Sequence, residues 1–323
     1  MIKRLSCFLK SSNRITNTLI NVSFYLLCLL ASYLLLLAFL GIVQELWTGS
    51  LPAFKRFGFG FITDSIWNPA TQQFGALGCI IGTLMTSCIA LVLAIPISFA
   101  LVIFNTTIAP NKIRKIIRVF IDLLAGIPSI VFGMWGLFVL APIVGSKIHP
   151  WIYAKISHIE WLSHLLLGSP FGVGIFTAGL VLAIMIIPFI SSIFYEVFEM
   201  VPQMLKESSF ALGATTWETI RYIVIPYGRM GLIGGIMIGL GRAMGETMAV
   251  SFVIGNAHTL TTALFQPANS ITSALANEFA ESYGSIYSSA LIELGFILFF
   301  ITAIVVLISQ FFLKRVLKRP KSY

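Results

Sequence analysis

Two charged side chains within one hydrophobic stretch are the best candidates for chemistry. Arg242 and Glu246 stand four residues apart in residues 231–254, so on a helix they share one face. Charged groups inside a membrane span are costly and are functional candidates by default. The planar donor fork of an arginine suits a tetrahedral oxyanion, and a glutamate can accept a hydrogen bond from a protonated one. The same spacing also fits a self-contained ion pair that holds helices together.

Two further acids lie in hydrophobic stretches and are second-rank candidates. Asp122 and Glu293 are each a turn or two from a predicted membrane face, where snorkelling or local water can solvate a carboxylate. The histidines lack the close spacing of a zinc site. They are His149, His158, His164 and His258. We therefore predict no metal site, no catalytic residue and no cofactor bound by this chain.

Glycines are frequent in the stretch that carries the two charges. They are Gly231, Gly234, Gly235, Gly239, Gly241 and Gly245. The pairs Gly235 with Gly239 and Gly241 with Gly245 have the spacing that lets helix backbones approach closely. This pattern fits a subunit interface, a path that brings a solute near the backbone, or packing within the chain.

A polar segment, residues 196–226, precedes the charged stretch and predicts a two-helix hairpin. Pro202 suits the start of a helix because its φ is fixed and its missing N–H would be unpaired there anyway. Gly213 can adopt the left-handed conformation that closes a helix. Thr215, with a glutamate three residues later, forms a capping box for the next helix, and Pro226 then bars easy continuation. A hairpin this short cannot bury its own core, so we expect it to contact a partner.

The composition is that of an integral membrane protein. Of 323 residues, 58% are hydrophobic and only 10% are charged, which is more apolar surface than a soluble fold can hide. The net charge of +9 comes from short basic clusters beside hydrophobic stretches, as topology signals do. Nucleic acid is therefore excluded as a partner, although a helix–glycine–helix segment also occurs in DNA-binding modules.

The hydrophobic stretches predict an all-α bundle of six transmembrane helices, each long enough to cross a bilayer. They are residues 22–43, 76–104, 119–144, 172–195, 231–254 and 287–313. An N-terminal tail (1–21) and a basic tail (314–323) flank this domain, and the first helix is too long for a signal sequence, so it is expected to be retained. Lys and Arg concentrate in both tails, in residues 105–118 and in the hairpin, which predicts that these parts and both termini are cytoplasmic.

The sequence of the hairpin resembles that of a known coupling element. The segment Glu207-Ser-Ser-Phe-Ala-Leu-Gly213, with Pro226 downstream, resembles the EAA loop by which permeases of ABC importers dock into their nucleotide-binding subunit. Ser208 and Ser209 stand where that motif usually has alanines. Serine is small enough to leave docking plausible, and its hydroxyl can hydrogen-bond a helix carbonyl.

Other segments resemble the PstC family of phosphate-importer permeases. These are Gly241-Arg-Ala-Met-Gly-Glu-Thr-Met-Ala-Val250, Ile254-Gly-Asn256, Phe74-Gly-Ala-Leu, Gly82-Thr-Leu, Ala94-Ile-Pro96 and Leu124-Ala-Gly-Ile-Pro-Ser129. The resemblance implies a type I ABC-importer permease fold in a bacterial inner membrane. It also implies a sister permease PstA, two copies of the ATPase PstB, and a binding protein PstS that delivers inorganic phosphate.

The resemblance assigns roles to residues as well. Arg242 and Glu246 match the charged motif implicated in phosphate translocation, where Glu246 can accept a hydrogen bond from hydrogenphosphate. Coupling to the ATPase is assigned to Glu207, Ser208, Ser209, Gly213 and Pro226. The chain has no Gly-x-x-x-x-Gly-Lys-Ser/Thr phosphate loop, so ATP is expected to be used by the partner subunit and the chain is expected not to be an enzyme.

Three other functions fit the same residues. A gradient-driven secondary transporter or channel would use Glu246 or Glu293 as a proton relay. A signalling or scaffold subunit would assemble without any flux through Arg242. An ABC permease for sulfate or molybdate would keep the architecture, but sulfate carries no proton near neutral pH for Glu246 to accept.

Overall fold

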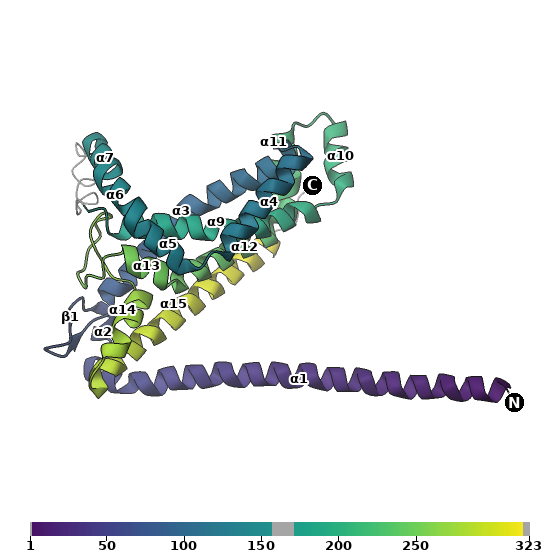
Figure 1. Ribbon diagram of the computed structural model, residues 1–323, viewed down its shortest axis with the longest axis horizontal. Helices are drawn as coiled ribbons and strands as arrows, with labels where there is room; N and C mark the ends of the chain where they lie inside the picture. Colours follow the sequence, from purple (N-terminus) through teal and green to yellow (C-terminus); the bar gives the residue numbers. More distant parts are fainter. Residues whose placement is uncertain (1, 157–170, 319–323) are drawn as a thin grey trace.

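Long helices dominate the molecule (Figure 1). The computed structural model describes the backbone of residues 2–156 and 171–318 and the side chains of residues 21–156 and 171–311. Six helical segments in these residues are long and apolar enough to cross a membrane. They are Asn21–Phe57, Leu77–Ile108, Ser129–Lys155, Ile175–Met200, Thr216–Gly245 and Ser285–Phe311. The prediction of an all-α, six-helix, multi-pass membrane protein is confirmed, while His158, His164 and the end of the basic tail lie outside the described residues.

The elements of the first half follow in chain order. They are α1 (Ile2–Phe57), α2 (Gly60–Thr63), β1 (Trp67–Asn68), β2 (Gln73–Phe74), α3 (Leu77–Ile103), the π-helix η1 (Phe104–Ile108), α4 (Asn111–Gly126), α5 (Ser129–Trp135), η2 (Gly136–Leu140), α6 (Ala141–Ile143), η3 (Val144–Ile148) and α7 (His149–Ile156). The strands β1 and β2 form an antiparallel hairpin that pairs Trp67 with Phe74.

The elements of the second half complete the bundle. They are α9 (Ile175–Met200), α10 (Gln203–Ala211), α11 (Thr216–Thr219), the π-helix η4 (Ile220–Val224), α12 (Ile225–Gly245), α13 (Met248–Val253), α14 (Ile271–Glu278), the 3-10 helix η5 (Phe279–Glu281) and α15 (Ser285–Lys318). In Figure 1, α10 and α11 lie at one end of the molecule, and β1, α2 and α14 lie at the other.

Helix α9 forms the core of the bundle. Its residues Ile186, Ile190 and Phe194 are at most 1% exposed, and α3, α4, α12 and α13 pack against it. A Cβ atom at Gly239 of α12 would lie 2.7 Å from Ile190, and one at Gly235 would lie 3.0 Å from an isoleucine of α9. This glycine pair therefore serves packing within the chain. Among the described residues, nothing lies within 4 Å of such an atom at the second pair, Gly241 and Gly245.

The predicted span 119–144 is wrong at its beginning. Residues 111–126 form the separate helix α4, and Ile127 is extended with φ −70° and ψ 129°. The cause is Pro128, whose ring disfavours the helical conformation of the preceding residue. The membrane-spanning run starts at Ser129 and continues to Lys155, so Asp122 belongs to α4 and not to a span.

The predicted span 231–254 differs at both ends. Pro226 sits in the first turn of α12, and the helical run from Thr216 passes through it to Gly245. The expectation that Pro226 interrupts the helix is therefore wrong. The π-helix η4 (Ile220–Val224) directly precedes it in the same run, and a local π adjustment is one way in which a membrane helix tolerates a proline. At the other end, α12 stops at Gly245 and α13 begins at Met248.

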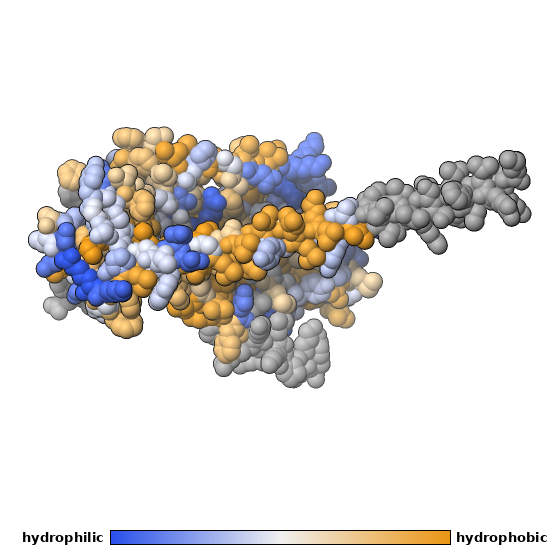
Figure 2. Space-filling model, turned by 90° about the horizontal axis from the view of Figure 1, so that it is seen from below, coloured by the Kyte–Doolittle hydropathy of each residue, from blue (hydrophilic) through white to orange (hydrophobic). Residues whose placement is uncertain are grey.

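Helix α1 contributes an exposed apolar surface. Its run from Asn21 has no buried residue in its most hydrophobic window, and it packs on α15 through ring contacts such as Trp47 with Phe296, 5.7 Å between centroids. Figure 2 shows the described part of α1 as a mostly hydrophobic surface, while hydrophilic residues gather mostly toward the two ends of the molecule. This distribution suits a protein embedded in lipid.

Candidate functional site

The charged stretch contains a break between two helices. After Gly245 the chain is extended at Glu246, with φ −72° and ψ 129°, and α13 then continues to Val253. The N–H of Gly174, at the start of α9, donates to the carbonyl of Val253 at 3.0 Å. The six residues of α13 span about 9 Å, and its last residue lies beside the beginning of α9. The break before α13 therefore lies within the bundle and not at its end. Irregular backbone at membrane depth is tolerated only where it is buried in protein or lines a cavity.

Neighbouring residues hold this break in place. The hydroxyl of Thr272 in α14 donates to the carbonyl of Glu246 at 2.7 Å. One carboxylate oxygen of Glu246 accepts from the N–H of Ala249 at 3.4 Å, so the side chain turns toward the first turn of α13. The break is therefore fixed from both sides by hydrogen bonds.

Arg242 lies in the last turn of α12 with unused hydrogen-bonding capacity. Its guanidinium carbon is 3.9 Å from the ring centroid of Phe189 in α9, a cation–π contact that orients the planar group. Its Nε atom is buried and donates no hydrogen bond within the described residues. A buried donor without an acceptor is costly, so the geometry suits an anion that enters from outside the chain.

The structure does not pair the two charges of the sequence-based site. Arg242 is helical, whereas Glu246 has left the helix, so the expectation of a shared helix face is wrong. Among the described residues, the only ion pair is between His258 and Glu278. The two groups flank the break without neutralising each other through a direct contact.

The hairpin adopts the local structure that its residues predict. Pro202 precedes α10, and Gly213 has φ +86°, which favours glycine because it has no side chain to clash. The Thr215 hydroxyl accepts from the N–H of Glu218 at 3.3 Å, and the Glu218 carboxylate accepts from the N–H of Thr215 at 2.8 Å. The predicted helix start, turn and capping box are confirmed.

The two serines of the hairpin act differently. Ser208 donates to the carbonyl of Met204 at 2.7 Å on an exposed surface. Ser209 is buried, and its hydroxyl lies 3.0 Å from that of Thr219, which joins α10 to α11. The departure from alanine at these positions is therefore accommodated, once by a helix carbonyl and once by an inter-helix contact.

The outer surface of the hairpin exposes apolar side chains. Leu212 is 89% exposed, Met204 75% and Trp217 54%. Glu207 is also exposed and helps to line a groove of about 420 Å³ between the hairpin and η1 with α4. An apolar patch on a hairpin that is otherwise polar marks an interaction surface.

A lysine anchors the hairpin to the end of α9. Lys206 donates to the carbonyl of Phe198 at 2.8 Å. Burial lowers the pKa of the Lys206 ammonium group, although the nearby Glu199 carboxylate favours its charged form. The contact ties α10 to the central helix of the bundle, so displacement of the hairpin would be transmitted to α9.

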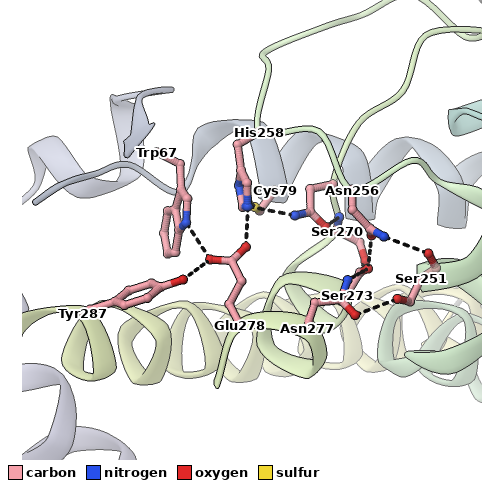
Figure 3. Close-up of polar contacts among 11 residues, drawn as sticks. Trp67, Cys79, Ser251, Asn256, His258, Ser270, Ser273, Asn277, Glu278 and Tyr287 are labelled. Atoms are coloured by element: carbon pink, nitrogen blue, oxygen red, sulfur yellow. Dashed lines mark hydrogen bonds and ion pairs between the residues drawn. The ribbon is translucent and has the colours of Figure 1, made fainter. Parts of the chain in front are cut away.

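A second polar network, far from the hairpin, surrounds Glu278 (Figure 3). The Trp67 indole and the Tyr287 hydroxyl donate to one carboxylate oxygen at 2.8 and 2.7 Å, and His258 pairs with the other. Burial by itself would raise the pKa of the Glu278 carboxyl, but the contacts from His258, Tyr287 and Trp67 outweigh burial and hold the pKa below its usual value. The network fastens the loop after α13 to β1, α14 and α15.

Sequence reasoning missed this network. Its members come from four separate segments, and further contacts reach Cys79, whose sulfur is 3.9 Å from His258 Nδ1, and Asn269. No spacing in the sequence could have brought them together. Asn256, with φ +51°, extends the network toward the break through Ser273, its partner at 2.6 Å.

The two second-rank acids, Asp122 and Glu293, lie outside the break that Arg242 and Glu246 flank. Asp122 is exposed on α4. Glu293 is 5% exposed and lines a pocket formed with α1 and α3. Neither is among the residues that contact Arg242 or Glu246. Within the described residues, no group of three or more His, Cys, Asp or Glu side chains is arranged to hold a metal ion.

The sequence matches the family described as "Binding-protein-dependent transport system inner membrane component" over residues 107–321. A protein of Mesorhizobium japonicum named "Phosphate transport system permease protein PstC" is 48% identical over 286 residues, which cover 88% of each chain. The protein of the same name from Haemophilus influenzae is 48% identical and covers 93% of this chain and 95% of its own. A "Probable phosphate transport system permease protein PstC" of Methanocaldococcus jannaschii is 35% identical over 90% of this chain and 93% of its own.

Solved structures of transporters share the fold. A bacterial alginate ABC transporter, determined in complex with an alginate-pentasaccharide-bound periplasmic protein, has a chain that matches with a TM-score of 0.61 and 20% identity, covering 90% of this chain and 95% of that one. The inward-facing MetNI methionine ABC transporter matches with a TM-score of 0.52 and 16% identity over 74% of this chain and 94% of that one. At these identities the likeness concerns the fold alone.

Proposed function

Because the chain belongs to the family of binding-protein-dependent transport permeases, and within it to the PstC phosphate permeases, we propose that it forms the translocation path of an ATP-driven importer of inorganic phosphate. The names of its relatives support phosphate as the solute. The observation that carries the proposal in this chain is the buried, unbonded Nε of Arg242 beside a broken helix.

The chemistry of the break suits hydrogenphosphate. A guanidinium group presents donors in a fixed fork that matches a tetrahedral oxyanion, and the contact with Phe189 keeps that fork oriented. Glu246 offsets part of the positive charge and can accept from the protonated oxygen of the solute, so that the anion is not held too tightly to leave. Arg242 and Glu246 are thus proposed as translocation residues, acting from two sides of the break.

The hairpin is proposed to couple this path to ATP hydrolysis in a separate subunit. Its exposed apolar side chains provide a docking surface. The bond from Lys206 to Phe198 and the continuous helix from Thr216 to Gly245 connect that surface to α9 and to Arg242. Movement of the hairpin would therefore shift the helices that flank the site, as alternating access requires. Within the hairpin, Glu207, Ser208, Ser209, Gly213 and Pro226 are proposed to shape the coupling element.

The proposed assembly contains a sister permease PstA, two copies of the ATPase PstB and the binding protein PstS, in the inner membrane of a bacterium. The hairpin and both termini would face the cytoplasm, and the Glu278 network would lie on the opposite side, where PstS delivers phosphate. The chain itself is proposed to bind no cofactor and to hydrolyse no nucleotide.

Labelled-phosphate uptake into vesicles tests this function. The vesicles contain the chain with its proposed partner subunits, and uptake is measured with and without internal ATP, with and without the binding protein, and with a protonophore. Uptake that requires both ATP and the binding protein and survives the protonophore is the expected result. Uptake driven by a proton gradient without ATP would favour a secondary transporter, and inhibition of phosphate uptake by excess sulfate or molybdate would indicate a permease for another oxyanion.

A further inference from the structure

One helix, α14, holds the whole segment from the break to the loop after α13. Four of its side chains contact residues 246–258. Thr272 donates to the Glu246 carbonyl at 2.7 Å, Ser273 donates to the Asn256 side chain at 2.6 Å, Asn277 accepts from the Ser251 hydroxyl at 3.0 Å, and Glu278 pairs with His258. The last three contacts can be followed in Figure 3. The segment is therefore held along the full length of α14.

Helix α14 is itself fixed to the rest of the bundle. At its start, the N–H of Ile271 donates to the hydroxyl of Thr83 in α3 at 2.9 Å. At its end, Glu278 accepts from Tyr287 of α15 and from Trp67 of β1. These contacts tie both ends of α14 to elements outside the segment, so α14 can set the position of the break relative to the bundle.

The contact with the break is the last link in a short chain of hydroxyl groups. Ser270 caps α14 by accepting from the N–H of Ser273 at 3.1 Å, and its hydroxyl lies 3.2 Å from that of Thr272. Because Thr272 donates its own proton to the Glu246 carbonyl, the proton between the two hydroxyls belongs to Ser270. Thr272 is 7% exposed and Ser270 is 2% exposed. Loss of either hydroxyl would therefore leave a shielded polar group without its partner, which is costly.

The bond from Thr272 constrains where Glu246 lies. Since α12 has ended at Gly245, the Glu246 carbonyl needs a donor from elsewhere in the molecule, and Thr272 supplies it. The carboxylate of the same residue accepts from the N–H of Ala249 at 3.4 Å. Backbone and side chain are thus held by different helices, which restricts the carboxylate to a narrow range of positions at the break.

We propose that α14 is the positioning element of the translocation site and that Thr272 is a positioning residue acting through Glu246. The side chains of Thr272, Ser273, Asn277 and Glu278 form one clamp, the α14 clamp, which keeps residues 246–258 in place. The inference rests on the proposed function, in which Glu246 accepts a hydrogen bond from hydrogenphosphate. Such a bond weakens steeply when its geometry is disturbed, so release of the clamp reduces transport without removing any group that meets the solute.

Hydrogen exchange tests the positioning without any transport step. The full chain, with whatever subunits co-purify, is placed in nanodiscs, and amide exchange in peptides from residues 246–253 is followed by mass spectrometry. Thr272→Val keeps the shape of the side chain but removes the hydroxyl, and exchange should rise about three- to tenfold, the effect of one hydrogen bond. Thr272→Ser keeps the hydroxyl and should retain most of the protection. Unchanged exchange in Thr272→Val would overturn the proposal.

The matched control is Thr302→Val. The Thr302 hydroxyl donates to the carbonyl of Leu298 at 2.9 Å, so this change removes a bond of the same kind within α15. Exchange in residues 246–253 should stay at the native level in this variant. An equal rise in Thr302→Val would show that any lost hydroxyl loosens the bundle and would refute a specific role of Thr272.

A double-mutant cycle tests whether Thr272 acts through Glu246. Initial-rate phosphate uptake is measured for Thr272→Val, for Glu246→Gln and for the double variant. Thr272→Val should reduce uptake about three- to tenfold, the effect of one hydrogen bond, and the double variant should transport no less than Glu246→Gln alone, because residues that act as a unit have non-additive effects. Losses that multiply would refute the positioning role.

The two proposals can fail separately. Native uptake by Glu246→Gln would refute the role of Glu246 in the proposed function, and with it the role of Thr272 in transport. The α14 clamp would fail by a different result, namely unchanged hydrogen exchange in Thr272→Val.

The far end of α14 tests whether the four contacts act together. His258→Leu removes the ion pair with Glu278, which lies about 9 Å along α14 from Thr272. Exchange in residues 246–253 should nevertheless rise at least twofold, and Asn277→Leu, at an exposed position, gives the same test if His258→Leu fails to accumulate. Arg56→Gln, which removes an exposed contact with Gln72, is the control and should change nothing. A rise confined to residues 254–262 would refute a single clamp.

Discussion

Replacement of Arg242 is the most direct test of the proposed path. Arg242→Gln keeps a side chain of related shape and removes the charge and the donor fork. Because Nε has no partner among the described residues, the substitution breaks no hydrogen bond of this atom within the described part of the chain. The loss should therefore appear in transport and not in assembly, apart from the contact with Phe189.

The loss of uptake in Arg242→Gln should reflect the hydrogen bonds that the guanidinium group makes to the solute. Hydrogen bonds to charged groups contribute about 1.5–3 kcal/mol, and each 1.4 kcal/mol is a factor of about ten. Uptake efficiency of Arg242→Gln should fall about 10- to 100-fold. Arg242→Lys keeps the charge but loses the donor fork, so its uptake efficiency should lie between those of the unaltered protein and Arg242→Gln. Phe189→Leu removes only the cation–π support, about 0.5–2 kcal/mol, and should reduce uptake several-fold through loss of orientation.

The assay is initial-rate uptake of labelled phosphate in vesicles with ATP and binding protein, with ATP hydrolysis measured in parallel. Arg229→Gln, on the same helix, is the matched control and should transport at close to the native rate. Native uptake by Arg242→Gln in an intact assembly would place the solute elsewhere and refute the reasoning. Loss of uptake in both variants would show that α12 responds to any lost charge.

Three further predictions concern stability and coupling. Gly82→Ala should strongly lower the thermal unfolding temperature of the purified protein, because the new Cβ would overlap the backbone carbonyl oxygen of Asn269 and overpacking costs about 1–3 kcal/mol. Gly78→Ala is the control and should leave the unfolding temperature nearly unchanged, because its Cβ would be 3.8 Å from its nearest neighbour. Thr215→Ala should weaken the capping box by about 1 kcal/mol and reduce ATP-dependent uptake, while Thr216→Ala, at a neighbouring exposed position, should not. Folding lowers the pKa of Glu278, so the stabilisation that the ionised carboxylate gives the fold is complete above its unfolded pKa near 4.5 and is lost as the pH falls through the folded value. The unfolding temperature of Glu278→Gln should therefore fall less steeply in acid than that of the unaltered protein. Equal slopes of unfolding temperature against pH for the two proteins would refute this role.

The hairpin illustrates what local sequence can predict. Pro202, Gly213 and Thr215 act on neighbours within four residues, so their consequences can be derived before any tertiary contact is known. Pro226 lies in the interior of the helical run Thr216–Gly245, where a proline by itself predicts a break. The run continues because the π-helix η4 precedes Pro226, and such a local adjustment accommodates the missing N–H.

The sequence by itself determined the membrane class, the number of spans, the hairpin and the choice of Arg242 and Glu246 as charges of interest. These follow from composition, hydrophobic length and short spacings, all of which are local properties of the chain. Tertiary structure decided that α12 ends at Gly245, that the two charges flank a break without pairing, that Glu278 joins four segments, and that Glu293 is buried beside a mostly apolar pocket. The physical reason is that burial and long-range hydrogen bonds depend on which helices pack together, and hydrophobicity reveals that a helix is apolar without specifying its neighbour.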